Sequence, residues 1–421
     1  MLMGTGSPER EFHTDDVRDL LHRTFSDIRL EGQRVLVIIP DRTRTAPIPL
    51  FVRLLHEALG ERVSHLDYLI GLGTHRPLDA EDVAALMGVR ADEWAACYPR
   101  STVYNHEWDR PDMLAAVGTI SRAEMAELSG GLLRTETPVT LNRRILDYDH
   151  LIICGPVFPH EVAGFSGGAK YLFPGIAGPR IIDATHWLGA LVTCMGTIGI
   201  QDTPVRRVIH RAAALVPRPI TCIALVMRDT TLHGMYSGTY EEAFNAAATL
   251  SARLNIVWKP RLYQRVLSMP SARYDDLWTA AKAMYKTEPV IADGGEVIIY
   301  APHLSEVSFV HGALIDYVGY HVRDYFLEQW ERFRDIPGAI LAHSTHVRGT
   351  GTYDREAGVE RPRIRVTLAT GIPEERCRRI NLGYADWRAL DPREWEGRED
   401  EGILCVHEAG EVLYRPGLTL A

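Results

Sequence analysis

Short apolar runs alternate with helical segments along this chain, and that alternation restricts its fold more than any other feature. Residues 34–40, 65–71 and 149–155 each predict a buried strand, because each is a short, mainly apolar run that ends at Pro or Gly. The segments at 47–59 and 79–87 carry apolar residues at helical spacing. Strands that alternate with helices predict an α/β fold with a doubly wound, mostly parallel sheet.

The alternation continues in the second half of the chain. There we expect strands at 219–227, 295–301, 339–342 and 365–368, and helices at 240–254 and 274–287. It pauses between Leu254 and Tyr274. We therefore predict two domains, an N-terminal α/β domain at residues 1–265 and a second, smaller α/β domain at residues 266–421.

Composition and charge exclude several classes of protein. The 421 residues include 46 Lys and Arg against 55 Asp and Glu, a formal net charge of −9, so a chain-wide basic footprint for nucleic acid is missing. The apolar stretch Leu188–Ile200 is shorter than the ~20 residues of a membrane span. Met1–Arg18 holds four acidic residues and no apolar core, so we expect no signal peptide. The six cysteines form no C-x-x-C pair, which argues against a zinc–thiolate site. We expect a cytoplasmic protein that binds neither nucleic acid nor a membrane.

Polar side chains are concentrated in the loops that follow three of the predicted strands. The first loop carries Asp41 and Arg44, the second carries His75 and Arg76, and the third is the long segment at 159–178. Loops at the carboxyl ends of parallel strands meet at one edge of a sheet. We therefore expect these groups to share a pocket.

The third loop contains the glycine-rich segment Gly164-Phe-Ser-Gly-Gly-Ala-Lys170. It is not a nucleoside triphosphatase loop, because Ala169 replaces the second glycine and Tyr171 replaces the metal-binding hydroxyl of that motif. Two interpretations stay open. Its backbone N–H groups and Ser166 bind a phosphate, or its glycines only permit a tight turn with positive φ. Lys170 is either a partly buried nucleophile or tether, or a surface lysine in a salt bridge.

Three histidines accompany these loops: His75, His160 and His186, of which His186 is expected on a helix after the glycine loop. Taken singly, each is more often a structural or exposed histidine than a base or a metal ligand. Residue chemistry alone thus predicts a pocket with histidines, a lysine, an Asp–Arg pair and a glycine loop.

This combination of three loop motifs and three histidines resembles that of the nickel-pincer nucleotide-dependent lactate racemase family. The motifs that carry the resemblance are Asp41-Arg-Thr-Arg44, Gly73-Thr-His75-Arg76 and the segment from His160 to Lys170, together with His186. Asp293-Gly-Gly295 and His343-Ser-Thr-His346 extend it into the second half of the chain.

The resemblance implies a cofactor and its contacts. The cofactor is a pyridinium-3-thioamide-5-thiocarboxylic acid mononucleotide that carries nickel, is attached covalently to Lys170, and has His186 as the protein ligand of its metal. Maturation enzymes that build this nucleotide are then partners. The remaining residues implied as cofactor contacts are Asp41, Ser166, Gly167, Gly168 and Pro174.

The resemblance also implies an isomerase reaction. A hydride leaves C2 of a 2-hydroxy acid, a 2-oxo acid stays bound, and the hydride returns to its opposite face. His75 and His160 are the implied catalytic acid and base, on two sides of the substrate. Arg44 and Lys282 are the implied clamp for the substrate carboxylate.

One position departs from the lactate-specific members, which have an aromatic residue and then Gln before the helix lysine. Here Trp278 takes the aromatic position and Thr279 replaces Gln. We expect a short-chain, lactate-like 2-hydroxy acid as substrate. The alternatives are a C2 epimerase of a polyhydroxy acid such as gluconate, with His343, His346 and Arg348 as added polar partners, and a non-catalytic nucleotide- or phosphate-binding protein. The sequence leaves assembly into a homo-oligomer open.

Overall fold

The computed structural model of the chain describes residues 1–417 and divides into two compact units. Unit 1 consists of Met1–Phe158, Phe165–Ile182 and Arg206–Leu254. Unit 2 consists of Pro159–Gly164, Asp183–Val205 and the described residues from Asn255 onward. Within residues 1–417, none of the helices combines the length and the apolar character needed to cross a membrane.

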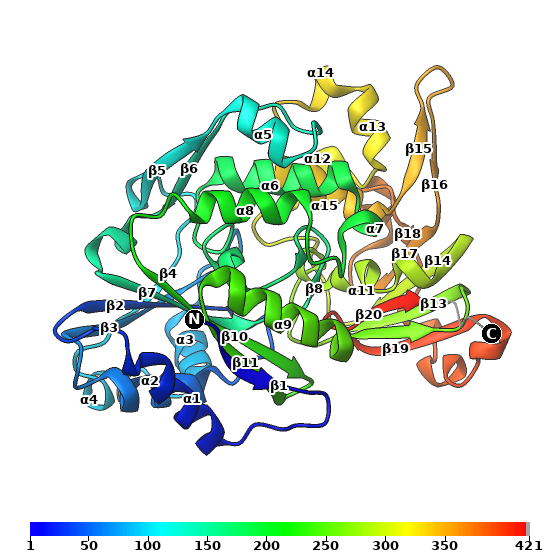
Figure 1. Ribbon diagram of the computed structural model, residues 1–421. Helices are drawn as coiled ribbons and strands as arrows, with labels where there is room; N and C mark the ends of the chain where they lie inside the picture. Colours follow the sequence, from blue (N-terminus) through cyan, green and yellow to red (C-terminus); the bar gives the residue numbers. More distant parts are fainter. Residues whose placement is uncertain (418–421) are drawn as a thin grey trace. The chain divides into compact units, whose positions relative to one another are not determined.

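Unit 1 is built on a seven-stranded sheet (Figure 1). Five neighbouring strands run parallel. Two further strands extend one edge, each paired antiparallel with the strand before it. In sheet order the strands are β1 (Met3–Gly6), β11 (Thr231–Gly238), β10 (Ile220–Arg228), β7 (His150–Pro156), β2 (Arg34–Ile39), β3 (His65–Ile70) and β4 (Val103–Asn105). The predicted mostly parallel sheet is confirmed.

Helices cover both faces of this sheet, as a doubly wound fold requires. Helices α1 (Thr14–Ser26) and α2 (Ile48–Leu59) pack on one face, because their apolar stripes share a core cluster with Val35, Val37 and Met235. Side chains alternate along a strand, so Gly234 faces the other side. There Leu250 of α9 (Tyr240–Asn255) lies over Gly234.

Unit 1 also contains α3 (Ala80–Met87), α4 (Trp94–Cys97), η1 (Pro111–Met113), β5 (Leu114–Ile120), α5 (Arg122–Leu128), β6 (Thr137–Asn142), η2 (Arg143–Asp147) and the single turn η3 (Gly168–Tyr171). The chain passes from one unit to the other before β8 (Pro159–His160), within β9 (Gly164–Phe165), α6 (Pro179–Val192) and α8 (Pro204–Ala213), and near the end of α9.

Unit 2 contains a second, smaller sheet in which all five strands are parallel. In sheet order they are β18 (Gly383–Tyr384), β17 (Arg365–Thr370), β14 (Ile291–Ala301), β13 (Tyr263–Pro270) and β19 (Ile403–Ala409).

One face of this sheet packs on a cluster that includes Leu267, Ile298 and Trp395. The helices of unit 2 are α7 (Cys194–Thr197), α10 (Leu277–Ala280), α11 (Lys282–Tyr285), α12 (Gly312–Val318), α13 (Arg323–Glu328), α14 (Trp330–Phe333), α15 (Gly338–Arg348) and α16 (Glu374–Arg379). Its remaining strands form two pairs, β12 (Ile256–Lys259) with β20 (Leu413–Pro416) and β15 (Gly351–Asp354) with β16 (Val359–Pro362).

Two predicted elements of the second half differ from the structure. The strand predicted at 339–342 is wrong, because these residues belong to helix α15. Every residue from Ala339 to Val347 is buried, so the helix shows no amphipathic spacing, and a four-residue apolar run does not separate a strand from a buried helix. The helix predicted at 274–287 is present only as the two short helices α10 and α11.

The two units also follow the chain differently from the predicted domains. The segments with His160 and His186 lie before residue 265, yet their contacts place them in unit 2. Asp183 at the start of one segment accepts a hydrogen bond from the backbone N–H of Ala339, and Pro159 in the other accepts one from Lys286. The domain boundary after residue 265 stays a prediction.

Candidate functional site

In unit 1, Asp41 and His75 follow two neighbouring parallel strands and form a direct pair. The Nδ1 atom of His75 lies 2.5 Å from Oδ2 of Asp41, and the Thr43 hydroxyl donates to the other carboxylate oxygen at 2.6 Å. Burial raises the pKa of the Asp41 carboxyl, but the charge and hydrogen bond of His75 outweigh it and hold that pKa below its ordinary value. Asp41 is therefore an ionised group that holds the His75 ring by a hydrogen bond at Nδ1.

Arg44 and the third loop lie close to this pair. The charge of Arg44 helps to lower the pKa of Asp41. The charges of Arg44 and Asp41 also influence the pKa of the buried Tyr171 hydroxyl, Arg44 lowering it and Asp41 raising it. The backbone N–H of Gly73 donates to the carbonyl oxygen of Gly175 at 2.8 Å, which ties the second loop to the third. We call Asp41, Arg44, His75 and Tyr171 the loop cluster. Arg76, by contrast, is exposed.

The glycine loop is held tightly within unit 1. The Ser166 hydroxyl accepts from the N–H of Phe158 at 2.9 Å, so it serves the loop itself. A Cβ on Gly167 would lie 2.4 Å from Val157, and one on Gly168 would lie 2.8 Å from Phe244, both at positive φ. These glycines are therefore required by backbone conformation and packing.

The tether candidate follows directly after these glycines. Lys170 lies in the turn η3 and is half-buried, and its backbone N–H bonds to the carbonyl of Gly167. Pro174 closes the next turn, since its carbonyl accepts from the N–H of Ala177. Lys170 thus starts from a fixed backbone position while part of its side chain reaches solvent.

In unit 2, His160 and Glu161 lie against two lysines. The backbone N–H of Val162 donates to Nδ1 of His160 at 3.1 Å, and Glu161 Oε2 lies 3.5 Å from the same nitrogen. Burial raises the pKa of Glu161, but the positive charges of Lys282 and Lys286 outweigh it and lower that pKa. Glu161 is therefore an ionised carboxylate that balances two lysine charges.

Three more histidines belong to the same group in unit 2. Burial lowers the pKa of His346 to about 4, although the charge of Glu161 opposes this change and that of His186 supports it. Burial also lowers the pKa of His343, helped by the charges of His346, His311, Lys282 and His186. We call His160, Glu161, His186, Lys282, Lys286, His343 and His346 the histidine cluster. The lowered pKa values keep His343 and His346 neutral, which is the form of imidazole that binds a metal.

The substrate-side candidates lie on α10 and α11 of unit 2. Trp278 packs on the ring of His343, with ring centroids 4.0 Å apart. The Thr279 hydroxyl donates to Oδ1 of Asp276 at 2.9 Å, and the same oxygen caps α10 by accepting from the backbone N–H of Thr279 at 3.0 Å. Lys282 is 6% exposed, and its ammonium group donates to the carbonyl of Thr279 at 3.0 Å.

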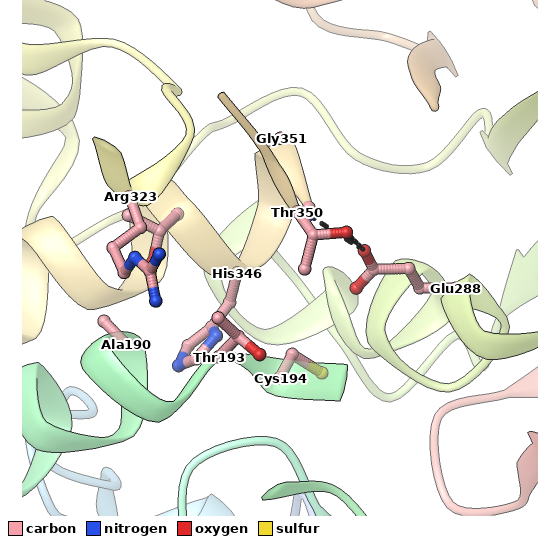
Figure 2. A pocket seen from close by; sticks show the side chains of 10 residues that line it. Ala190, Thr193, Cys194, Glu288, Arg323, His346, Thr350 and Gly351 are labelled. Carbon is pink, nitrogen blue, oxygen red and sulfur yellow. Dashed lines mark hydrogen bonds between the residues drawn. The ribbon is translucent and has the colours of Figure 1, made fainter. Parts of the chain in front are cut away.

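A cavity of about 170 Å³ lies in unit 2 beside His346 (Figure 2). Its polar lining includes Thr193, Glu288 and Thr350, and the N–H of Thr350 donates to Oε1 of Glu288 at 3.0 Å. Burial raises the pKa of Glu288. Among residues 1–417, neither Oε2 of Glu288 nor Nε2 of His346 has a hydrogen-bond partner.

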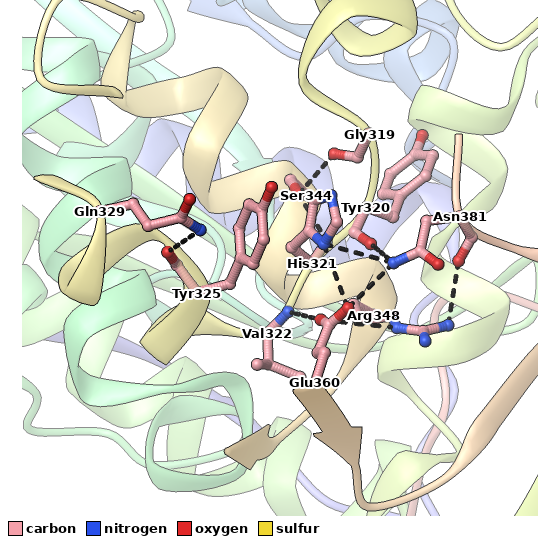
Figure 3. A network of polar contacts seen from close by, with 10 residues as sticks. All are labelled: Gly319, Tyr320, His321, Val322, Tyr325, Gln329, Ser344, Arg348, Glu360 and Asn381. Carbon is pink, nitrogen blue, oxygen red and sulfur yellow. Dashed lines mark hydrogen bonds and ion pairs between the residues drawn. The ribbon is translucent and has the colours of Figure 1, made fainter. Parts of the chain in front are cut away.

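Arg348 belongs to a separate polar network (Figure 3). It donates to the carbonyl of Asn381 at 3.0 Å and lies 3.8 Å from Glu360. Glu360 also accepts from the N–H of Val322 and contacts His321. Figure 3 shows these groups facing one another, so Arg348 serves the internal structure of unit 2.

Several members of the two clusters were not predicted as site residues. Glu161 adjoins His160, and Lys286 lies one helical turn after Lys282, so both had a sequence signal in their spacing. The strand-end positions of Asp41 and His75 predicted that they lie close together, but no sequence signal predicted the hydrogen bond between them.

The residues fit the implied nucleotide in part. Within the described chain, no group of three or more His, Cys, Asp or Glu side chains is arranged to hold a metal ion. His186 among neutral imidazoles suits a metal whose other donors come from a bound cofactor. The half-buried Lys170 suits a covalent tether.

Known proteins resemble this chain in sequence. Residues 18–194 match the lactate racemase N-terminal domain. The chain is 24% identical over 276 residues to the lactate racemase of Thermoanaerobacterium thermosaccharolyticum, which covers 64% of this chain and 60% of that protein. It is 23% identical over 276 residues to the lactate racemase of Lactiplantibacillus plantarum, which covers 63% of this chain and 59% of that protein. The matches thus span about 60% of the length of these curated relatives.

Solved structures resemble it over nearly its whole length. A crystal structure of a protein from Thermotoga maritima matches with a TM-score of 0.89 at 31% identity, covering 97% of this chain and 99% of that one. The lactate racemase apoprotein from Thermoanaerobacterium thermosaccharolyticum shares the fold, with a TM-score of 0.69 at 19% identity over 94% of this chain and 92% of that one. The sequence matches support the lactate racemase family, with its N-terminal domain at residues 18–194, and the structural matches show the shared fold.

Proposed function

We propose that this protein racemises a short-chain, lactate-like 2-hydroxy acid at C2 with a nickel-pincer nucleotide tethered to Lys170. The observation that carries the proposal is the Asp41–His75 pair, an ionised carboxylate bonded to a half-exposed imidazole at the end of a parallel strand. Such a pair fixes the orientation of the imidazole ring, which removal of a hydroxyl proton by that ring requires. The two curated relatives are both named lactate racemase.

The nucleotide, when bound, supplies a carbon that accepts a hydride from C2 and returns it. Lys170 would attach it through its amine, and His186 would bind its nickel through a neutral imidazole. The glycine loop that precedes Lys170 fixes the start of that attachment through its backbone bonds. The maturation enzymes that make the nucleotide are proposed partners, in the cytoplasm.

The other proposed roles follow from charge and proton chemistry. His75 and His160 would hold or move the hydroxyl proton of the substrate, and a positioned acid or base of this kind contributes roughly 10²–10⁴-fold to a rate. Arg44 and Lys282 would bind the substrate carboxylate. Trp278, packed against His343, would give an apolar wall. Thr279 has no side-chain amide, and its hydroxyl already bonds to Asp276.

A C2 epimerase of a polyhydroxy acid such as gluconate is the second candidate. The cavity beside His346 favours it, since Glu288 and Thr350 give that cavity a polar lining. Arg348 does not add to this case, because it serves the network around Glu360.

A side-by-side assay of the nickel-loaded protein on lactate, 2-hydroxybutyrate and gluconate tests the proposal. We expect racemisation of both short acids, with rates that differ by no more than about 10–200-fold, because one methylene is worth only ~1–3 kcal/mol in an apolar pocket. Preference for gluconate would support the epimerase instead. Bound nucleotide without turnover on any of the three would indicate a binding protein and contradict the proposal.

A further inference from the structure

We infer that the cavity beside His346 in unit 2 binds a small uncharged compound with two or more hydroxyl groups, of about the size of glycerol. All ten residues that line this cavity belong to unit 2, so the site is complete within that unit. The inference does not rest on the proposed function, because no step of the racemisation enters it.

The size of the cavity sets the size of the ligand. Its volume is about 170 Å³, and an apolar cavity of about 150 Å³ in a protein interior is large enough for benzene. The cavity beside His346 therefore has room for about six non-hydrogen atoms. Ala190 and Cys194, which are 1% and 3% exposed, contribute apolar atoms to its wall, and the carbon atoms of a ligand can pack against them.

Two polar atoms of the lining residues lack a partner. Glu288 is completely buried and His346 is 3% exposed, yet neither Oε2 of Glu288 nor Nε2 of His346 has a hydrogen-bond partner among residues 1–417. The other carboxyl oxygen of Glu288 is occupied, because Oε1 accepts from the backbone N–H of Thr350 at 3.0 Å. Figure 2 shows both side chains at the cavity. A buried polar atom without a partner is costly, and a hydrogen-bonding group of a ligand removes that cost.

A hydroxyl group matches both atoms. Oε2 of Glu288 donates when the carboxyl is protonated and accepts when it is ionised, and Nε2 of His346 donates or accepts according to its tautomer. A hydroxyl can donate and accept, so it pairs with each atom in either state, whereas a carboxylate only accepts and an ammonium group only donates. Two such atoms in one cavity therefore favour a ligand with at least two hydroxyl groups.

The charges around the cavity favour an uncharged ligand. The guanidinium group of Arg323 donates to Oδ1 of Asp324 from Nε at 3.1 Å and from Nη2 at 2.9 Å, and to the carbonyl of Leu191 from Nη1 at 3.0 Å. Oε1 of Glu288 lies 3.8 Å from the guanidinium group of Arg363. Burial raises the pKa of Glu288, which favours its uncharged form. An ionic ligand would thus meet no unpaired charge of the opposite sign among the ten residues of the wall.

A metal ion and water are less suitable occupants. Within residues 1–417, no group of three or more His, Cys, Asp or Glu side chains could hold a metal ion, so Glu288, His346 and Cys194 do not form such a group. Water can pair with Oε2 of Glu288 and Nε2 of His346, but it leaves the apolar atoms of Ala190 and Cys194 against a polar solvent. A small polyol suits both the polar and the apolar part of the wall.

Saturation-transfer NMR of the full-length chain with glycerol tests the inference. We expect saturable binding with a dissociation constant on the order of 1 mM, which a ligand of about six non-hydrogen atoms can reach. Lactate, of the same size but charged, and gluconate, which is charged and larger than the cavity, should not displace glycerol. A glycerol signal that rises without saturation, or displacement by lactate, would overturn the inference. Binding of gluconate without binding of glycerol would assign the cavity to the chain of a polyhydroxy acid and overturn the free polyol.

A cavity-filling variant locates the bound glycerol. Thr345 lines the cavity, and its hydroxyl donates to the carbonyl of Ala342 within α15. Thr345→Phe should place its ring in the cavity and abolish saturable binding. Thr249→Phe is the matched control and should bind glycerol as the wild type does, because Thr249 is exposed and its hydroxyl also bonds within its own helix. Equal binding by the two variants would show that glycerol binds elsewhere and overturn the inference.

Three further variants test the polar partners. His346→Phe keeps a ring but loses Nε2, and Glu288→Met loses the carboxyl, so each should weaken glycerol binding at least about fivefold, as expected for a lost hydrogen bond. Glu288→Gln keeps an oxygen for Thr350 and presents N–H groups in place of Oε2, so it should bind within about threefold of the wild type. Wild-type affinity in both His346→Phe and Glu288→Met would overturn the inference. If Thr345→Phe or Glu288→Met does not fold, His346→Phe still decides the outcome.

Discussion

The guanidinium group of Arg206 donates to the carbonyl oxygen of Gly167 at 3.1 Å from a position that is 2% exposed. It also donates to the carbonyl of Phe165 and lies over the ring of Phe244, 3.9 Å from the centroid. Burial lowers the pKa of Arg206 to about 9. A buried guanidinium group thus holds the glycine loop that directly precedes Lys170.

We expect Arg206→Met to lower the free energy of unfolding by about 2–4 kcal/mol, since two carbonyl groups lose a charged donor. Urea unfolding of the chain without cofactor measures the change. Arg207→Met is the matched control, because Arg207 is the exposed neighbour, and it should change stability by less than about 0.5 kcal/mol. Equal stability of the two variants would show that the loop does not depend on Arg206.

The histidine cluster should make stability depend on pH. Burial lowers the pKa of His346 from 6.5 to about 4, so the unfolded chain binds this proton more readily than the folded chain does. Stability from this group is present above pH 6.5 and is lost as the pH falls toward 4, by about 3 kcal/mol in total.

Thermal or urea unfolding between pH 7.5 and about 4 checks this sign. His346→Gln should flatten that part of the profile, while His22→Gln, at an exposed position, should reproduce the wild-type slope. A wild-type profile that stays flat over this window would contradict the burial argument.

The proposed catalytic histidines should matter for turnover and not for nickel content. His75→Ala and His160→Ala should each lower the racemisation rate roughly 10²–10⁴-fold, because each removes a group that acts on the substrate proton or oxygen. Nickel per chain, measured by elemental analysis, should stay near the wild-type value. Normal racemisation by His75→Ala would refute the proposed role of the Asp41–His75 pair.

His186 should behave in the opposite way. His186→Ala removes the proposed protein ligand of nickel, so we expect loss of bound metal together with activity. His343→Gln tests specificity for this position, because His343 lies in the same cluster but bonds to Tyr285 and Tyr320 with its two nitrogens. Full nickel in His186→Ala would place the ligand elsewhere.

Most of unit 1 was predictable because its strands are buried on both faces. The runs at 34–40, 65–71 and 149–155 correspond to β2, β3 and β7, whose apolar character and flanking Gly or Pro identify a parallel sheet. The same criterion failed at 339–342, where a helix is buried on all sides and gives the same short apolar run.

The candidate site was predictable only where polar side chains directly follow the ends of the strands. Asp41, Arg44 and His75 come after β2 and β3, so their proximity follows from topology. That the Asp41 carboxylate bonds to His75 depends on side-chain geometry, which no spacing encodes. The grouping of His160 and His186 with Lys282 and His346 depends on two short segments that join unit 2 through tertiary contacts.

The intact mass of the protein tests the central claim most directly. The protein is produced together with the enzymes that make the nickel-pincer nucleotide, and its mass and nickel content are measured beside those of Lys170→Ala. The account predicts one nucleotide adduct on the wild-type chain, none on Lys170→Ala, and racemisation only by the modified form. An unmodified wild-type chain that racemises a 2-hydroxy acid would contradict it.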